Sequence, residues 1–344
     1  MSERVLDKTY YADYAKPLWR RTLINRESAI VVLLFAVIIT ACTTVPNFAE
    51  TITIYHILQN YFTALMLALP MCLVMITGDI DISVGSMVGL SCSLTGVVYN
   101  AGGPLEVGML CGIAVGLLGG LVNGLLVTRI GLPALAVTLG TMALFRGLAV
   151  GMLGTTTVTK FPENWTMIPQ LEITGTGIPV VMIFYVLLAG VFVWLLHFTT
   201  FGRGIYAIGL NAQAATFSGV NSGRTRTIAF VLAGGLAGLG GVYWTLLRGV
   251  ARGDTGDGLE LQVIAAIVLG GVSVFGGVGT IWGSIAGVLL IGTLANALQV
   301  VGITADIIKI ITGGLLIAAV LAGSLITWIN NRRAKLDRLS TDGD

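Results

Sequence analysis

Long apolar stretches follow one another along this chain and are separated by short polar segments. A helix of roughly 20 mainly apolar residues is long enough to cross a lipid bilayer. By this criterion the pattern predicts ten membrane-spanning helices between residues 29 and 329. They are expected at 29–45, 57–77, 84–100, 106–128, 133–153, 178–198, 227–247, 261–275, 281–301 and 307–329. The predicted fold is therefore an all-α, polytopic membrane bundle.

The composition agrees with this interpretation. Hydrophobic residues make up 55% of the chain, charged residues 10%, and the mean hydropathy is +0.91. Soluble globular domains carry about 25% charged residues, so a soluble domain is excluded. The transmembrane domain is expected over 29–329. The polar segments 1–28 and 330–344 are expected to form an N-terminal segment and a C-terminal tail outside the membrane.

Basic residues are distributed unevenly between the two sides of this predicted bundle. With an inner N-terminus, fourteen of the nineteen Lys and Arg residues fall on the inner side and three on the outer side. Cytoplasmic segments of membrane proteins are enriched in Lys and Arg. Both termini are therefore predicted to be cytoplasmic. The net charge of +2 reflects the same excess and indicates no nucleic-acid partner.

The 47 glycines are arranged in two informative ways. Several recur every fourth residue, which lets membrane helices pack closely; these are Gly112, Gly116, Gly120 and Gly124, then Gly234 and Gly238, then Gly279, Gly283 and Gly287. Others cluster around 78–85 and 269–279 and predict two interrupted segments. Interrupted segments in corresponding halves are typical of an internal duplication around a central pathway. We expect such a duplication, with these two segments as its counterparts.

Two acids, Asp79 and Asp81, stand in the first interrupted segment, inside a region from 27 to 128 that lacks Lys and Arg. A carboxylate at membrane depth costs several kcal/mol unless it faces water, a partner or the bundle interior. One interpretation places both acids at the aqueous end of a helix as caps. The other places them in a broken crossing that lines a cavity. Asp81 is expected to bond the amides near Val84 and Gly85 and so fix the turn.

The polar segment 199–226 is expected to carry a short helix outside the lipid. Asn211 can cap its start and Gly219 can end it. Small side chains dominate the helix, so it is shaped to dock in a groove on another protein, although an ordinary interfacial loop is the alternative. The residues expected to make this contact are Gly209, Asn211, Ala212, Ala214, Ala215, Ser218 and Gly219.

Three segments together resemble the sugar-type permease subunits of ABC importers, which serve ribose, xylose, galactose, rhamnose and autoinducer-2 uptake. Residues 78–85, Gly-Asp-Ile-Asp-Ile-Ser-Val-Gly, are similar to that family's signature, with Asp79 in place of a glycine. Residues 201–220 resemble its coupling loop, and 258–279 its late signature. Asp81 aligns with the acid of the signature. Asp79 stands where a glycine is usual and is expected to face water.

The resemblance implies an importer subunit in the bacterial inner membrane. Such a permease pairs with a second permease, identical or similar, with two cytoplasmic ATPase subunits and with a periplasmic solute-binding protein. It binds no cofactor and is not itself an enzyme. The chain has no Gly-Lys-Ser/Thr of a nucleotide-binding loop, so ATP would bind a separate chain.

A small neutral sugar or sugar-like solute is the expected cargo. Amide and hydroxyl groups suit transient hydrogen bonds with sugar hydroxyls, although each amide could instead join two helices. The residues expected along the path are Gln59, Asn60, Gly78, Asp81, Ser83, Gly85, Asn123, Asn296 and Gln299.

Two competing functions remain at this stage. An ion-coupled secondary transporter would use Asp79 and Asp81 to bind a proton or sodium ion. A membrane-embedded enzyme would use the acids for chemistry, but His56 and His197 stand beside no acid or cysteine in a catalytic or metal-ligand spacing. No catalytic or metal site is predicted. Arg146, inside the fifth span, is expected to pair with a carboxylate across the bundle.

Overall fold

The structure is a computed structural model that describes residues 26–154, 156–315, 317–318 and 321. Most of the predicted N-terminal segment, the end of the last span and the predicted C-terminal tail lie outside these residues. Almost everything described is helical. The elements are α3 (Arg26–Thr44), α4 (Thr51–Ile76), α5 (Val84–Asn100), α6 (Leu105–Thr128), α7 (Ala134–Leu153), α8 (Glu163–Thr166), η1 (Ile168–Gln170), β1 (Glu172–Ile173), β2 (Ile178–Pro179), α9 (Val181–Phe198), α10 (Thr200–Leu210), α11 (Ala212–Phe217), α12 (Ser222–Arg248), α13 (Leu259–Leu269) and α14 (Ile281–Val300), followed by a helical stretch at 305–315.

Nine of the predicted spans overlap a described helix, the described part of the tenth, 307–315, is helical, and the all-α polytopic prediction is confirmed. In the described part of the chain, six helices are long and apolar enough to cross a membrane: α4, α6, α7, α9, α12 and α14. The prediction for 261–275 is wrong at its end. Helix α13 stops at Leu269, because Gly270 follows and Gly271 takes a left-handed conformation with φ of 92°.

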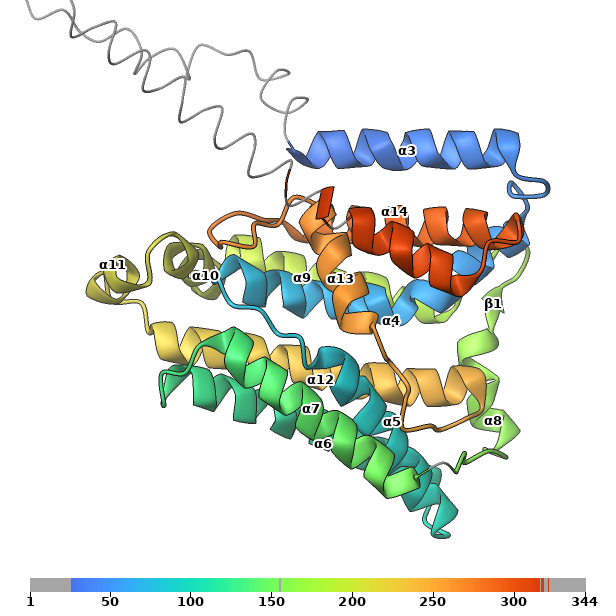
Figure 1. The fold of residues 1–344 in the computed structure, drawn as a ribbon, viewed down its shortest axis with the longest axis horizontal. Coiled ribbons are helices and arrows are strands. Elements are labelled where there is room, and N and C mark those ends of the chain that lie inside the picture. The colour runs from blue at the N-terminus through green and yellow to red at the C-terminus, as the bar shows by residue number, and fades with distance from the viewer. Residues whose placement is uncertain (1–25, 155, 316, 319–320, 322–344) are drawn as a thin grey trace, which may run out of the picture.

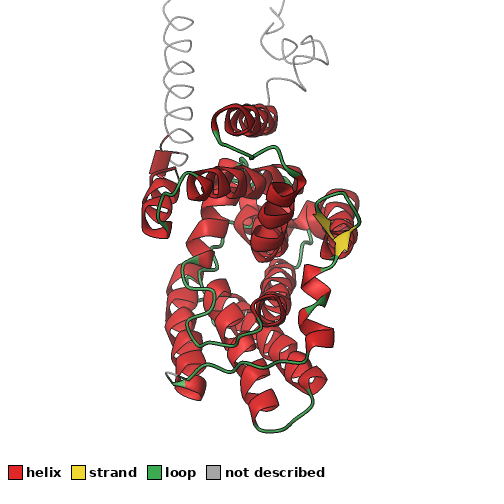
Figure 2. Cartoon of the chain, turned by 90° about the vertical axis from the view of Figure 1, so that its right-hand side faces the viewer, coloured by secondary structure: helices red, strands yellow, loops and turns green. Residues whose placement is uncertain are grey.

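The long helices run side by side, roughly along one direction (Figure 1). Helices α10 and α11 project at one end, called here the α11 end, and α8 with the β1–β2 hairpin lies at the other, the β1 end. Helix α3 lies at the edge of the bundle (Figure 2) and buries Ile30 and Leu34 against Ala286 and Leu290 of α14. The molecule therefore has two distinct ends joined by a helical body.

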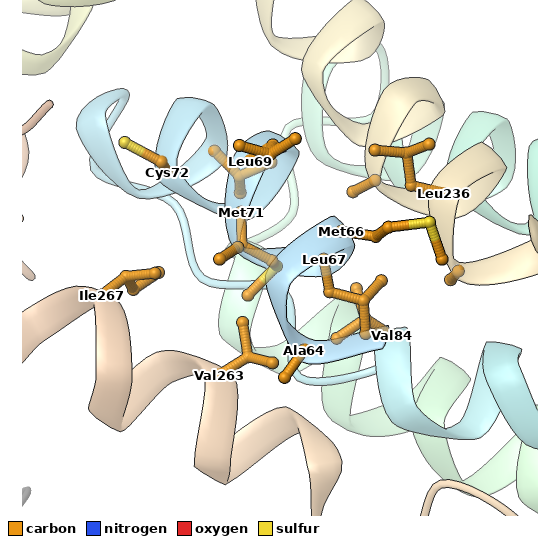
Figure 3. Close-up of a cluster of buried hydrophobic side chains, with 14 of the residues drawn as sticks. Ala64, Met66, Leu67, Leu69, Met71, Cys72, Val84, Leu236, Val263 and Ile267 are labelled. Carbon is orange, nitrogen blue, oxygen red and sulfur yellow. The ribbon is translucent and has the colours of Figure 1, made fainter. Parts of the chain in front are cut away.

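Helix α4 forms the centre of the bundle. Its residues from Phe62 to Ile76 are almost wholly buried. Figure 3 shows Met66 of α4 beside Leu236 of α12, and Met71 near Val263 of α13. A helix that is apolar on every face is stable only when other helices surround it, so α4 is the scaffold for the segments that follow it.

The glycine spacing produces close helix packing, as predicted. Gly116 and Gly120 of α6 lie against the backbone of Gly234 and Phe230 of α12, where an added Cβ would collide with main-chain atoms. Gly283 likewise lies against the backbone of Gly270. These contacts lock α6 to α12 and the start of α14 to the end of α13.

The central helix of each half of the chain packs against helices of the other half. Helix α12 packs against α5 and α6, and α4 packs against α13 and α14. Each of these two long central helices is followed by a non-helical segment and then by α5 or α13. The counterpart of the segment after α4 is therefore 249–258 after α12, and the predicted pairing with 269–279 is wrong. The reason is positional, since 269–279 follows the short helix α13 rather than a long central one.

Candidate functional site

Three breaks interrupt the helices: the first break at 77–83, the second break at 249–258 and the third break at 270–280. Gly78 begins the first break with φ of 85°, a conformation that favours glycine. Both acids of this break are buried, with Asp79 5% and Asp81 0% exposed. The break is thus a packed polar crossing inside the protein.

Asp81 holds the turn that opens α5. Its Oδ1 accepts hydrogen bonds from the Ser83 amide at 2.9 Å and from the Ser83 hydroxyl at 2.6 Å. Asn123 of α6 donates to the same hydroxyl at 2.8 Å. The carboxylate was expected to bond the amides near Val84 and Gly85; the amide that it reaches is that of Ser83, directly before Val84, because an aspartate side chain reaches the amide two residues ahead. Asp81, Ser83 and Asn123 form one buried cluster.

That cluster also holds two acceptors without a partner. Among the described atoms, neither Asp81 Oδ2 nor Asn123 Oδ1 receives a hydrogen bond. Both residues are completely buried. Since buried acceptors are normally satisfied, this is the least satisfied polar position in the first break.

Asp79 is paired with an arginine. Arg226 Nε donates to Asp79 Oδ2 at 2.6 Å, and Arg226 Nη2 donates to Oδ1, which makes a two-pronged ion pair. Thr77 also donates to Oδ2 at 3.1 Å. The expectation that Asp79 faces water is wrong. Its partner lies 147 residues away in sequence, so only the packing of α12 beside α4 brings the two together.

A second buried charged group lies where α5 and α13 begin. Glu260, in the first turn of α13, is 9% exposed and its Oε2 lies against Gly85. Arg146 of α7 donates to the carbonyl oxygens of Gly253 and Thr255 at 3.0 and 2.8 Å, and its charge also acts on Glu260. Arg146 thus holds the second break mainly through backbone oxygens.

Removing the Arg146 charge is expected to loosen the second break. In Arg146→Met two carbonyl groups lose a charged donor, at a cost of about 2 kcal/mol or more. The unfolding temperature of the detergent-solubilised protein should fall by several degrees. Arg129→Met, which removes the same charge from an exposed position, serves as the control. An unchanged unfolding temperature in Arg146→Met would show that these bonds stabilise nothing.

The three sequence segments singled out by pattern meet at the α11 end. Gly277 of the third break donates its amide to Ile76 O, the last carbonyl of α4, at 2.8 Å. Gly209 of α10 lies directly on Ile76 O and on the amide of Gly277. Tyr206 of α10 donates its hydroxyl to Gly279 O at 2.6 Å. Helix α10 therefore touches the last residue of α4, directly before the first break, and the third break.

The segment 199–226 contains two helices, α10 and α11, where one was predicted. Asn211 caps α11 by accepting from the Ala214 amide at 2.9 Å, and Gly219 follows with φ of 87°. Within α11 the small residues point in different directions: Ala214 is exposed and Ala215 is 4% exposed. The expectation that Ala215 contacts a partner is therefore wrong. Ala212, Gly209 and Ser218 occupy the same two helices and the turn after them.

The amides expected along one path are scattered instead. Gln59 is buried and donates to Tyr55 Oη and to Pro169 O, while Asn60 is exposed and accepts from Arg248. Asn123 belongs to the Asp81 cluster. On α14, Asn296 is half-buried and Gln299 exposed. Gly78 lies in the first break and Gly85 in the first turn of α5. The residues expected along the path thus include buried, half-buried and exposed ones.

The sequence analysis missed Arg226 as the partner of Asp79, Glu260 as a buried acid and Tyr206 as a contact of the third break. Arg226 follows Arg224 by two residues at the start of a helix, so one of the two had to leave the solvent-facing side. That spacing was the available signal. Glu260 and Tyr206 carry no local signal of this kind.

Comparison with known proteins gives a consistent result. Residues 53–320 match the protein family described as branched-chain amino acid transport system / permease component. The chain is 35% identical to the autoinducer 2 import system permease protein LsrC of Salmonella choleraesuis, over 82% of this chain and 80% of that protein. It is 32% identical to the corresponding LsrD of Salmonella paratyphi A, over 92% of this chain and 98% of that protein. No solved structure matches.

Proposed function

Because the chain belongs to the branched-chain amino acid transport system / permease component family, we propose that it is the permease subunit of an ATP-driven importer for a small neutral, polyhydroxylated solute. The observation that carries the proposal is the contact of α10 with the end of α4, directly before the first break, and with the third break at the α11 end. A segment that projects from the bundle and also touches its interrupted helices can couple an external partner to the pathway.

The proposed complex contains two permeases, two ATPase subunits and a solute-binding protein. The ATPases would bind at the α11 end, on the cytoplasmic side of the bacterial inner membrane, together with both termini. The binding protein would face the β1 end. There the outer loop at 156–180 joins the second break through the paired backbones of Val158 and Ala251, which supplies a fixed surface.

A neutral cargo is supported by the small number of charges near the breaks. Asp79 is already paired with Arg226, and the charge of Arg146 acts on Glu260. Asp79 is therefore not free to bind a charged solute. The relatives are named for autoinducer 2 import, so autoinducer 2 belongs in a substrate screen beside pentoses, hexoses and polyols.

Uptake into proteoliposomes tests the proposal. The permease, its co-encoded ATPase and its binding protein should together accumulate one of these solutes only when ATP is inside. A secondary transporter using Asp81 would instead accumulate solute in response to a proton or sodium gradient, with the permease alone and no ATP. That result would replace the proposal.

Helix α11 provides a test of the ATPase contact. Phe217 is 92% exposed at its end, and exposed aromatic anchors often dominate interfaces. Ala214→Glu and Phe217→Ala should each weaken co-purification of the ATPase about tenfold or more, with the amount of permease in the membrane unchanged.

Met167→Ala is the matched control, since Met167 is 60% exposed at the β1 end. Ala215→Glu should act differently, because a charge placed in a buried position lowers the stability of the permease itself. Normal ATPase binding by both Ala214→Glu and Phe217→Ala would exclude α11 as the docking element.

A further inference from the structure

Residues 76–79, at the end of α4, are held by both ends of the segment 199–226. From one end, Gly209 of α10 packs on Ile76 O. From the other end, Arg226 of α12 binds Asp79 through both carboxylate oxygens. Two routes therefore link α11 to the end of α4 and the start of the first break, one through α10 and one through α12.

The second route, from α11 through the start of α12 to Asp79, is short and consists of hydrogen-bonded residues. Asn221 caps α12 by accepting from the Arg224 amide at 3.0 Å, and the hydroxyls of Thr216 in α11 and Ser222 in α12 lie 2.9 Å apart. Arg226 follows within the second turn of α12. A displacement of α11 is therefore carried through Ser222 and one turn of helix to the Asp79 carboxylate.

The ion pair has no stabilising excess that would explain it by itself. A buried pair gains its Coulomb energy at the expense of desolvating two charges, and neutral replacements of both partners are often as stable. The pair also joins the residues that follow α4 to the second turn of α12, two segments whose paired residues are 147 positions apart in sequence.

We propose that Asp79 and Arg226 form a positioning pair that transmits displacement of the coupling segment 199–226 to the first break. The pair acts on the position of the break and touches no substrate. This inference rests on the proposed ATP-driven transport and specifies how the two are linked.

A double-mutant comparison tests it in the reconstituted complex. Asp79→Asn leaves the partly buried Arg226 without its counter-charge, and Arg226→Met leaves the buried Asp79 without its own. The double variant Asp79→Asn/Arg226→Met removes both charges and should restore stability. Three quantities are measured for each: unfolding temperature, ATP hydrolysis, and solute transported per ATP. Arg224→Met, an exposed charge two residues away on the same helix, is the control.

On the proposal, both single variants and the double variant lose about tenfold in solute transported per ATP, while hydrolysis continues and Arg224→Met matches wild type. The double variant regains the wild-type unfolding temperature but not transport. If it regains both, the pair only stabilises the fold and the proposal is wrong. If wild type itself shows no ATP-driven uptake, the proposed function fails first, and that outcome is distinct from either.

Discussion

Replacing Asp81 by alanine is expected to abolish most uptake, whereas replacing it by asparagine should preserve most of it. Alanine leaves the Ser83 amide and hydroxyl buried without their shared acceptor. Each buried unsatisfied group costs about 1–3 kcal/mol, and about 1.4 kcal/mol already corresponds to a factor of ten. We therefore expect uptake to fall about tenfold or more. Initial uptake rates, normalised to the amount of protein in the membrane, measure this.

Asparagine keeps Oδ1 as the acceptor for Ser83. Its amide nitrogen would replace Oδ2, an acceptor that receives no hydrogen bond from any described residue. Loss of charge is therefore tolerable at this position. Ser93→Ala is the matched control, since Ser93 is equally buried in α5 and its hydroxyl has no partner among the described atoms. Uptake lost equally in Asp81→Asn and Asp81→Ala would show that the charge itself, as in ion coupling, is required.

The two acids of the first break should thus respond in opposite ways to neutralisation. Asp81→Asn removes a charge that no cation faces directly, while Asp79→Asn strands the Arg226 charge. The sequence alone does not distinguish the electrostatic surroundings of the two acids, because no basic residue stands near either one. Only the path of α12 beside α4 distinguishes them.

Local patterns predicted most of the fold. Apolar length placed the described long helices, glycine spacing placed the α6–α12 contact, and Asn211 with Gly219 placed α11. These features depend on a few neighbouring residues. The predictions that were wrong concern contacts between residues far apart in sequence. They are the direction in which Ala215 points, the partner of Asp79, and the pairing of the breaks. All three depend on which helices become neighbours.

The partners of the amide side chains also depend on which helices become neighbours. Gln59 and Asn60 are adjacent in sequence, yet one is bonded inside the bundle and the other reaches an exposed arginine. A polar residue in an apolar span indicates a need for a partner, and it does not indicate whether that partner is solute, water or another helix. The geometry of the neighbouring helices decides this.

A large steric effect is expected from Gly209→Ala. An added Cβ at Gly209 would collide with Ile76 O and with the amide of Gly277, which are themselves joined by a hydrogen bond. Backbone atoms cannot adopt another rotamer as a side chain can. Helix α10 must therefore move away from the end of α4 and from the third break. Overpacking of this kind costs about 3 kcal/mol, and uptake should fall at least tenfold with the protein still in the membrane.

Gly204→Ala is the matched control in the same helix. Its added Cβ would approach the side chain of Val220 at 3.3 Å, which can shift by a few tenths of an ångström, and would make only ordinary contact with Thr225 at 3.9 Å. Both variants raise the helix propensity of α10 equally, so a difference between them reports the contact with the breaks. If Gly209→Ala transports as well as Gly204→Ala, then α10 does not act through Ile76 and Gly277, and coupling must pass through the Asp79–Arg226 route alone.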